Sequence, residues 1–207
     1  MAKPARAVVT CMDYRVKEDV ILTHLGWQRE GAYVLRNAGG SVTQDVIRSL
    51  MLLQKFVLKQ SSGEGTYDIQ IAVIAHTDCG MITSDGGEDE LRRKIESDFW
   101  ICETPPFALE TFLNPQLAVR RSFQRLHTSR FVSSRTDEGL RISGYVFDVL
   151  ANPPSLKEAK MHVVKGGEDW DRVAAIHKLT VRKLKDANPQ AKDEPRTGVG
   201  QVLYIPS

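Results

Sequence analysis

A run of apolar and β-branched residues over positions 69–75 constrains the fold of this chain more than any other stretch. Its nearly continuous hydrophobicity predicts a strand that is buried on both faces, as in a parallel sheet covered by helices. The run ends at His76, and Cys79 follows just before Gly80. In an open α/β sheet, ligands bind at the carboxyl ends of the strands, so these two side chains stand where a functional site is expected.

A histidine and a cysteine at this spacing also occur in ordinary protein cores, where a free cysteine packs as a small hydrophobe. A second cysteine favours a metal site, because Cys11 follows another apolar run at 7–10 and opens the segment Cys11-Met-Asp-Tyr-Arg15. We interpret Cys11, His76 and Cys79 as three metal ligands. Three protein ligands with an open fourth position are typical of catalytic zinc, whereas a structural zinc site is normally closed by a fourth ligand.

Length and charge limit the class of protein. The 207 residues, 42% of them hydrophobic, are enough for one core, so we expect a single domain over 1–207. The 28 basic and 26 acidic residues nearly cancel without a dense basic block, which favours a small-molecule partner over nucleic acid or a membrane. Without an apolar signal segment or a membrane-length apolar run, we expect a cytoplasmic protein whose thiols stay reduced. The third cysteine, Cys102, is expected to be a packed residue.

The hydrophobic periodicity predicts alternating strands and helices. This alternation indicates an α/β fold with a mainly parallel central sheet flanked by helices. The aromatic segment 99–112 either covers a pocket, packs on another subunit or folds onto its own core. The predicted strands span 5–10, 31–36, 69–75, 140–150 and, at an edge, 199–205, and the predicted helices span 17–27, 43–59, 90–97, 114–127 and 166–186.

Two polar features adjoin the proposed ligands. Asp13 and Arg15 are two positions apart, so an extended segment would turn them to the same side, where the guanidinium keeps the carboxylate ionised. An ordinary surface ion pair is the alternative. Gly39 and Gly40 let the backbone turn sharply and bring amides close to a ligand, although they could equally serve the turn alone.

The motifs CxDxR at 11–15, Arg36-Asn-Ala-Gly-Gly40 and HxxC at 76–79, in this order, resemble those of the β-class carbonic anhydrase family. The similarity covers most of the chain and continues through the strand at 142–148. The resemblance implies one zinc ion per subunit held by Cys11, His76 and Cys79, with Asp13 and Arg15 as the catalytic pair. It also implies a homodimer or homotetramer whose active sites lie near the subunit interface.

The chain departs from the family pattern in three respects. Almost nothing precedes the first strand, so we expect no amino-terminal helical arm. Tyr14 stands where the family usually has a small residue, which would put bulk beside the metal. The segment 99–112 is unusually aromatic. A short branch of the family includes carbonyl sulfide and carbon disulfide hydrolases, and these departures leave the substrate open between that branch and the carbonic anhydrases.

The expected chemistry is attack by zinc hydroxide on a small linear heterocumulene, because zinc lowers the pKa of a bound water towards roughly 7. Asp13 would accept the proton of the hydroxide, or would instead swing onto the zinc and block it, a resting state of the family. The substrate pocket is expected to contain Tyr14 and the backbone amides of Ala38, Gly39, Gly40 and Gly80, which would stabilise the developing anion.

We favour carbonyl sulfide hydrolysis to CO₂ and H₂S, with hydration of CO₂ to bicarbonate as the alternative. Carbonyl sulfide suits a drier pocket, and none of His24, His127, His162 and His177 stands out as the proton shuttle that fast CO₂ hydration needs. A remote alternative is a non-catalytic, zinc-stabilised interaction protein.

Overall fold

The computed structural model describes residues 5–60, 69–99, 108–132, 140–191 and 197–207. Most of the aromatic segment, residues 100–107 with Cys102, lies outside these ranges, so its role stays a prediction.

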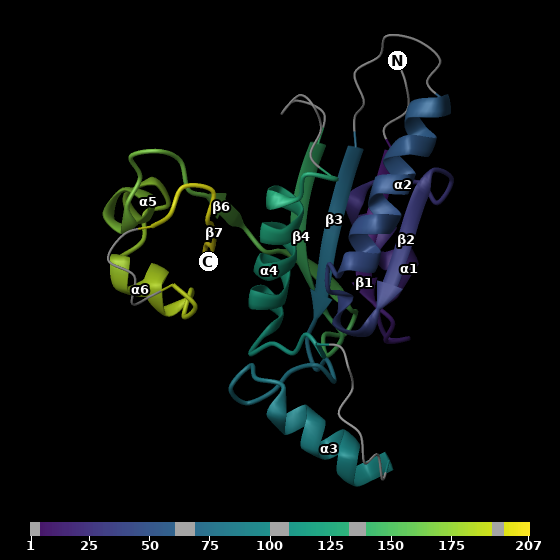
Figure 1. Cartoon of the computed structure of the whole chain (residues 1–207), viewed down its shortest axis with the longest axis horizontal. Coiled ribbons are helices and arrows are strands. Elements are labelled where there is room, and N and C mark those ends of the chain that lie inside the picture. Colours follow the sequence, from purple (N-terminus) through teal and green to yellow (C-terminus); the bar gives the residue numbers. More distant parts are fainter. Residues whose placement is uncertain (1–4, 61–68, 100–107, 133–139, 192–196) are drawn as a thin grey trace.

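The centre of the molecule is a five-stranded sheet in the order β2-β1-β3-β4-β5 (Figure 1). Four of its strands are parallel, and only β5 runs antiparallel to its neighbour β4. This arrangement confirms the mainly parallel α/β fold. The strands are β1 (Ala5–Cys11), β2 (Ala32–Asn37), β3 (Ile69–His76), β4 (Leu140–Asp148) and β5 (Ser155–Glu158).

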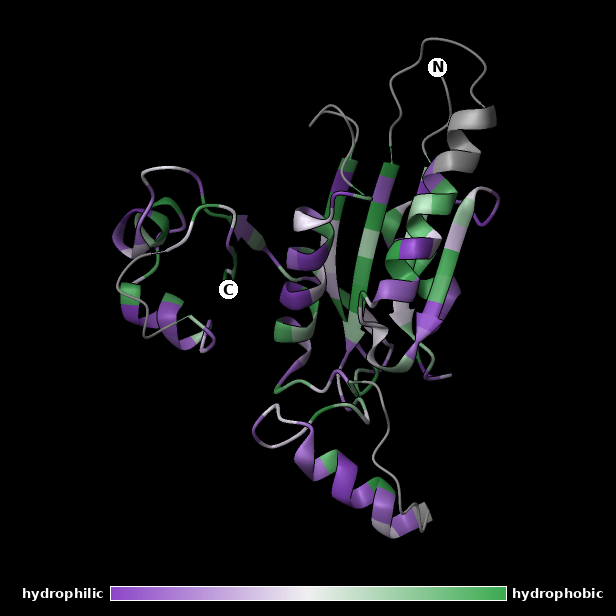
Figure 2. Cartoon of the chain, viewed as in Figure 1, coloured by the Kyte–Doolittle hydropathy of each residue, from purple (hydrophilic) through white to green (hydrophobic). Residues whose placement is uncertain are grey.

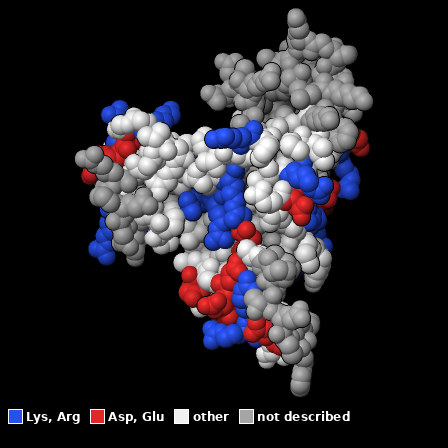
Figure 3. Space-filling model, viewed as in Figure 1, with Lys and Arg blue, Asp and Glu red and all other residues white. Residues whose placement is uncertain are grey.

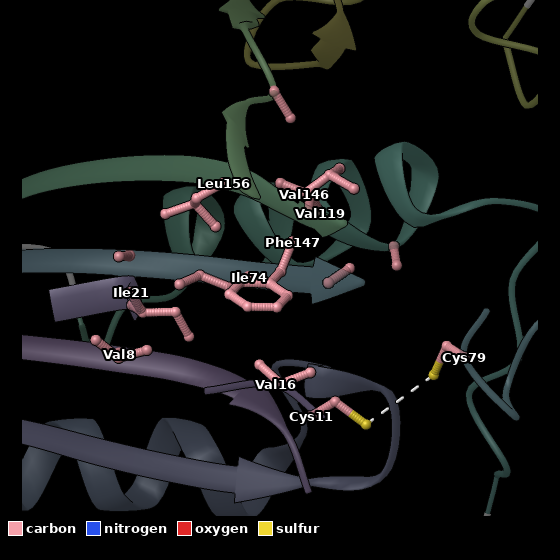
Figure 4. Packing of buried hydrophobic residues seen from close by; sticks show 14 of the residues in the cluster. Val8, Cys11, Val16, Ile21, Ile74, Cys79, Val119, Val146, Phe147 and Leu156 are labelled. Carbon is pink, nitrogen blue, oxygen red and sulfur yellow. Dashed lines mark hydrogen bonds between the residues drawn. The ribbon is translucent and has the colours of Figure 1, made fainter. Parts of the chain in front are cut away.

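Helices cover both faces of this sheet. Alternate residues of the central strands enter different cores: Val8 and Ile74 pack with α1, whereas Val9 and Val73 pack with α2. Figure 4 shows the first of these cores, with Val8, Ile21 and Ile74 in one apolar layer. Burial on both faces explains why these strands are almost continuously apolar in sequence. The flanking helices are α1 (Glu18–Leu25), α2 (Gln44–Gln60) and α4 (Pro115–Thr128).

Helix α4 begins where the sequence predicts, because the Asn114 side chain accepts a hydrogen bond from the Leu117 amide and Pro115 occupies the first turn. Its buried face combines small and large side chains. Ala118 and Ser122 are buried together with Val119 and Leu126, while Leu117 and Phe123 are only partly buried. Small residues allow α4 to lie close to the sheet: a Cβ on Gly144 of β4 would come 2.4 Å from Val119 Cγ1.

The predicted helix over 166–186 is wrong, because this stretch forms α5 (Trp170–Ile176) and α6 (Val181–Asp186). Lys178 adopts a positive φ of 56°, which ends the helical path, and the Thr180 side chain caps a new helix by accepting from the Lys183 amide. Ile176, the last residue of α5, is 50% exposed.

The carboxyl-terminal strand also differs from the prediction. β7 (Val202–Tyr204) pairs with β6 (Met161–Val163) in a separate antiparallel ribbon and not with the main sheet. A third apolar cluster, which includes Trp170, Leu184 and Leu203, forms here beside the main sheet (Figure 1). Gln124 of α4 joins the two parts, since it accepts from the Val202 amide at 2.6 Å and donates to Gly200 O at 3.0 Å. A single domain over 1–207 stays a prediction.

Helix α3 (Asp89–Phe99) projects from the sheet and is mainly hydrophilic (Figures 1 and 2). On the face shown in Figure 3, basic side chains gather near α4, with acidic side chains beside them. Glu110 pairs with Arg125 at 2.9 Å and with Arg121 at 3.5 Å, which partly neutralises this basic area. Among the described residues, no helix combines the length and apolar character needed to cross a bilayer.

Candidate metal centre

The pairing of β1 with β3 brings the predicted ligands together. Thr10 lies opposite Ile74 in this parallel pair, so both strands end at the same edge of the sheet, where Cys11 and His76 follow. Cys79 lies in the turn after β3, with its Sγ 4.0 Å from Cys11 Sγ, and Figure 4 shows the two sulfur atoms facing each other. The donor atoms of Cys11, His76 and Cys79 all lie within 4.8 Å of one another, and all three residues are buried.

The geometry of this group fits zinc. A tetrahedral ion with Zn–S bonds of about 2.3 Å separates its two sulfur ligands by roughly 3.8 Å, close to the observed spacing. His76 Nδ1 lies 2.8 Å from Thr77 O, so this nitrogen donates its proton to the backbone and leaves the lone pair on Nε2. His76 Nε2 is buried and has no hydrogen-bond partner within the described part of the chain. An orphaned buried nitrogen beside two thiols is the arrangement expected of a zinc ligand set.

The two thiols influence each other's protonation. A hydrogen bond from Cys79 lowers the pKa of Cys11 to about 4, although burial opposes the shift. The same hydrogen bond, together with burial, raises the pKa of Cys79. One thiol of the pair therefore loses its proton more readily than the other, and a metal that binds both sulfurs as thiolates must displace the second proton.

The Asp13–Arg15 pair lies beside this group. Arg15 Nη2 is 2.7 Å from Asp13 Oδ2, and Arg15 Nε also donates to Asp13. These hydrogen bonds lower the pKa of Asp13 to about 2. Asp13 Oδ2 also lies 3.9 Å from His76 Nε2, so the carboxylate faces the metal ligands. The two residues meet in a turn closed by the Arg15 amide on Asp13 Oδ1 at 2.9 Å, not along the extended segment that the sequence suggested.

The glycine loop supports the ligand on β1. Gly39 and Gly40 have φ values of 75° and 66°, and a Cβ on Gly40 would come 2.7 Å from Ile74 O and 2.9 Å from the Cys11 amide nitrogen. The backbone amide of Gly39 hydrogen-bonds to the Cys11 thiol. Glycine is therefore needed at position 40 for packing between the ends of β1 and β3, in addition to forming the turn.

The other predicted pocket residues are exposed. Ala38 and Gly80 lie at the surface beside the buried ligands. Tyr14 is 82% exposed, and Lys17 Nζ lies 5.7 Å from the centre of its ring. Within a single chain, the Tyr14 side chain therefore adds no bulk beside the metal ligands.

Two of the larger cavities among the described residues adjoin the sheet. A cavity of about 900 Å³ lies along β4, with Trp27, Phe123 and Tyr145 in its wall, and includes none of the three ligands. A cavity of about 650 Å³ borders the glycine loop, with Ala38 and Met81 in its wall, and Met81 in turn contacts Gly39. Proximity to the metal ligands makes the second cavity the better candidate for a substrate.

Sequence reasoning missed the residues that hold the His76–Cys79 turn. The Thr77 hydroxyl donates to Asp148 Oδ1 at 3.0 Å and accepts from the Val149 amide at 3.0 Å. Asp78 Oδ2 lies 2.7 Å from Arg15 Nη1. Position 78 stands between two predicted ligands, which was a usable signal, but nothing near Asp148 in the sequence connects it to this turn.

Known proteins resemble this chain over much of its length. "Beta-carbonic anhydrase 1" of Mycobacterium bovis is 36% identical over 143 residues, which are 69% of this chain and 76% of the relative. "Carbon disulfide hydrolase" of an Acidianus species is 46% identical over 81 residues, which are 39% of this chain but only 34% of that enzyme. The crystal structure of carbonic anhydrase from Streptococcus mutans superposes with a TM-score of 0.57 at 30% identity, covering 76% of this chain and 83% of the other.

No model of a protein family matches the chain. The sequence relationship and the structural superposition nevertheless agree with the Cys-His-Cys group at the sheet edge. The chain belongs to the β-carbonic anhydrase family and is a zinc-dependent enzyme.

Proposed function

We propose that this enzyme hydrolyses carbonyl sulfide, with hydration of CO₂ as the alternative. Zinc would be held by Cys11, His76 and Cys79. The observation that carries the proposal is the Asp13 carboxylate, which is fixed by Arg15 and lies 3.9 Å from His76 Nε2. A linear, uncharged heterocumulene has an electrophilic carbon, so a metal-activated nucleophile with one oriented polar partner is sufficient to attack it.

Zinc bound by two thiolates and an imidazole supplies a nucleophile derived from water at neutral pH. Asp13 is also ionised at neutral pH, because Arg15 lowers its pKa to about 2. A carboxylate of such low pKa is a weak base, so its main role is to accept a hydrogen bond and orient the nucleophile.

Backbone amides complete the proposed site. Gly39 donates to Cys11, which leaves the exposed positions Ala38 and Gly80 as the better candidates to donate to the charge that develops on the substrate. The 650 Å³ cavity beside them has apolar side chains such as Leu35, Leu91 and Leu109 in its wall, which suits an uncharged gas.

Two considerations favour the sulfur substrate. The relative that is 46% identical over 81 residues is named a carbon disulfide hydrolase, an enzyme for another sulfur-containing heterocumulene. In addition, fast CO₂ hydration needs a proton shuttle near the zinc, and the described contacts of the four histidines other than His76 do not involve the three proposed ligands. His24 contacts Tyr145, His162 contacts His177 and Glu168, and His127 borders the 900 Å³ cavity. CO₂ hydration remains the alternative because the longer match is to a protein named a carbonic anhydrase.

We assign the protein to the cytoplasm as a homodimer or homotetramer. Reduced Cys11 and Cys79 require a reducing compartment. Met12 and Tyr14, which flank Asp13, are 68% and 82% exposed, and a second copy of the chain would cover such a surface. Light scattering tests the oligomeric state, since a monomer at micromolar concentration would contradict the proposed homodimer or homotetramer.

Paired gas assays test the substrate. Purified zinc-loaded protein is given CO₂ in a stopped-flow pH assay and carbonyl sulfide in a sulfide-release assay, and Asp13→Asn is assayed in parallel. We expect sulfide release that depends on Asp13. Fast CO₂ hydration with negligible sulfide release would identify a carbonic anhydrase instead. Zinc-loaded protein that is inert to both gases, with a cobalt-substituted form that does not respond to azide, would support the non-catalytic alternative.

A further inference from the structure

Arg15 connects the segments that follow β1 and β3, the two strands at whose ends the proposed metal ligands lie. On one side its Nε and Nη2 atoms donate to Asp13, which follows Cys11. On the other side its Nη1 lies 2.7 Å from Asp78 Oδ2, and its Nη2 lies 3.0 Å from Asp78 O. Asp78 stands between the ligands His76 and Cys79. One guanidinium therefore joins segments that are 63 positions apart in the chain.

The conformation of Asp78 is what brings its carboxylate to Arg15. Its φ of 55° lies in the left-handed region, which residues other than glycine seldom adopt and which aspartate and asparagine tolerate best. The side chain is 59% exposed, so its ion pair contributes little to folding stability. A residue held in an uncommon conformation to make a weakly stabilising contact calls for a functional explanation.

We propose that Asp78 is a positioning residue for the reaction, whose carboxylate holds the far end of the Arg15 guanidinium so that Arg15 keeps Asp13 facing the metal ligands. This inference rests on the proposed function of Asp13. With one carboxylate partner, a long arginine side chain that is 34% exposed can rotate about its ion pair. With carboxylates at both ends, the planar guanidinium is fixed in one orientation.

The surrounding contacts allow this role to be separated from support of the metal site. The preceding residue, Thr77, is held by the Phe147 carbonyl at 3.0 Å and by Asp148, so the turn does not depend on the Asp78 side chain. Asp78→Asn keeps a residue that tolerates the left-handed conformation, and it keeps the backbone oxygen that accepts from Arg15. The substitution removes the charge and leaves one neutral acceptor oxygen on the side chain, so zinc binding should persist.

The experiment compares wild type, Asp78→Asn and a matched control, Asp186→Asn. Asp186 is an exposed carboxylate (69%) that pairs with Arg182 on α6 at 3.8 Å, in the separate carboxyl-terminal part of the fold. For Asp78→Asn we expect wild-type zinc content and melting temperature, a kcat about tenfold lower and a nearly unchanged KM, since displacement of an orienting group mainly affects turnover. The control should match wild type in every measurement.

Two further readouts test whether Asp78 acts through Arg15. In the cobalt-substituted protein, the visible spectrum and the azide affinity should change in Asp78→Asn, because Asp13 is no longer held in one position, and should not change in Asp186→Asn. In an Arg15→Lys background, Asp78→Asn should cause no further loss of kcat.

The possible failures are distinguishable. Wild-type protein that is zinc-free, or inert to both gases, refutes the proposed function before any variant is made. Suppose instead that the wild type is active and zinc-loaded. An Asp78→Asn variant with the same kcat and cobalt spectrum as this wild type then refutes only the positioning role. Loss of zinc from Asp78→Asn, or an undiminished effect in the Arg15→Lys background, also refutes it, because Asp78 would then act on the metal site independently of Arg15.

Discussion

The Sγ atoms of Cys11 and Cys79 lie 4.0 Å apart although 68 positions separate the two residues in the chain. The parallel pairing of β1 with β3 brings them together, because Cys11 is the last residue of β1 and Cys79 lies in the turn after β3. The group of Cys11, His76 and Cys79 therefore forms only when these two strands are paired, and a bound metal should in turn stabilise their pairing.

The first prediction concerns Cys79→Ala. Removal of one thiolate should abolish stoichiometric zinc binding, and the variant should melt at a lower temperature than the zinc-loaded wild type, because metal binding contributes to folding free energy. Metal analysis and thermal melts with and without a chelator test this prediction. The chelator should lower the melting temperature of wild type and leave the variant unchanged. A variant that still binds one zinc ion per chain would remove Cys79 from the ligand set.

The second prediction concerns Asp13→Asn. Asparagine keeps the shape of the side chain but loses the charge held by Arg15, so zinc should remain while turnover falls by about 10²-fold, the size of effect expected when a nucleophile is no longer correctly oriented. Steady-state assays together with zinc analysis measure both effects, and Asp186→Asn serves as the control. Full activity in Asp13→Asn would exclude Asp13 from the mechanism.

The third prediction separates the packing of Gly40 from its backbone conformation. Gly40 and Gly167 have φ values of 66° and 79°, but only at Gly40 would a Cβ meet other atoms within 4 Å. Gly167→Ala should cost about 1 kcal/mol of unfolding free energy, for the conformation alone. Gly40→Ala should cost about 1–3 kcal/mol more, because the methyl group would displace Ile74 O or the Cys11 amide. Urea denaturation measures both costs, and equal losses would show that the close approach at Gly40 is relieved without penalty.

The fourth prediction concerns pH and the carboxyl-terminal part. His177 Nε2 lies 3.0 Å from His162 Nδ1, and His162 Nε2 lies 2.9 Å from Glu168 Oε2. Burial, with the nearby His162 and Lys160, lowers the pKa of His177 below its ordinary value of 6.5, and Glu168 opposes the shift only partly. His177 then binds a proton more readily in the unfolded chain than in the folded one. The contribution of neutral His177 to folding stability is therefore complete above about pH 6.5 and is lost as the pH falls.

Glu168 extends the loss to lower pH. Hydrogen bonds from the Lys165 amide and from His162 lower the pKa of Glu168 below 4.5, so the contribution of ionised Glu168 to folding stability is present above that value and is lost below it.

Hydrogen exchange of β6 and α5 at about pH 7.5 and 5.5, corrected for intrinsic rates, tests the His177 effect. Protection should fall at the lower pH in wild type and should change less in His177→Asn. Equal protection of the wild type at both pH values would contradict the prediction.

Local sequence patterns predicted much of the fold. Helix α2 follows from its apolar face, and α4 follows from Asn114 and Pro115 at its start, because these signals act within a few residues. The same kind of pattern failed over 166–186, where apolar residues continue across two helices. The break at Lys178 and the cap at Thr180 are determined by how α5 and α6 fold onto their shared cluster with Trp170 and Leu203.

The sequence by itself predicted the parallel sheet, a group formed by Cys11, His76 and Cys79, and the Asp13–Arg15 pair, because hydrophobic runs and short spacings encode strands and neighbouring contacts. Only the tertiary structure decided that Asp78 reaches Arg15 across 63 positions and that Asp148 holds Thr77 across 71. It also decided that Tyr14 points into solvent. Such contacts depend on how strand ends and turns are placed relative to one another after the core has packed, and no local pattern specifies that placement.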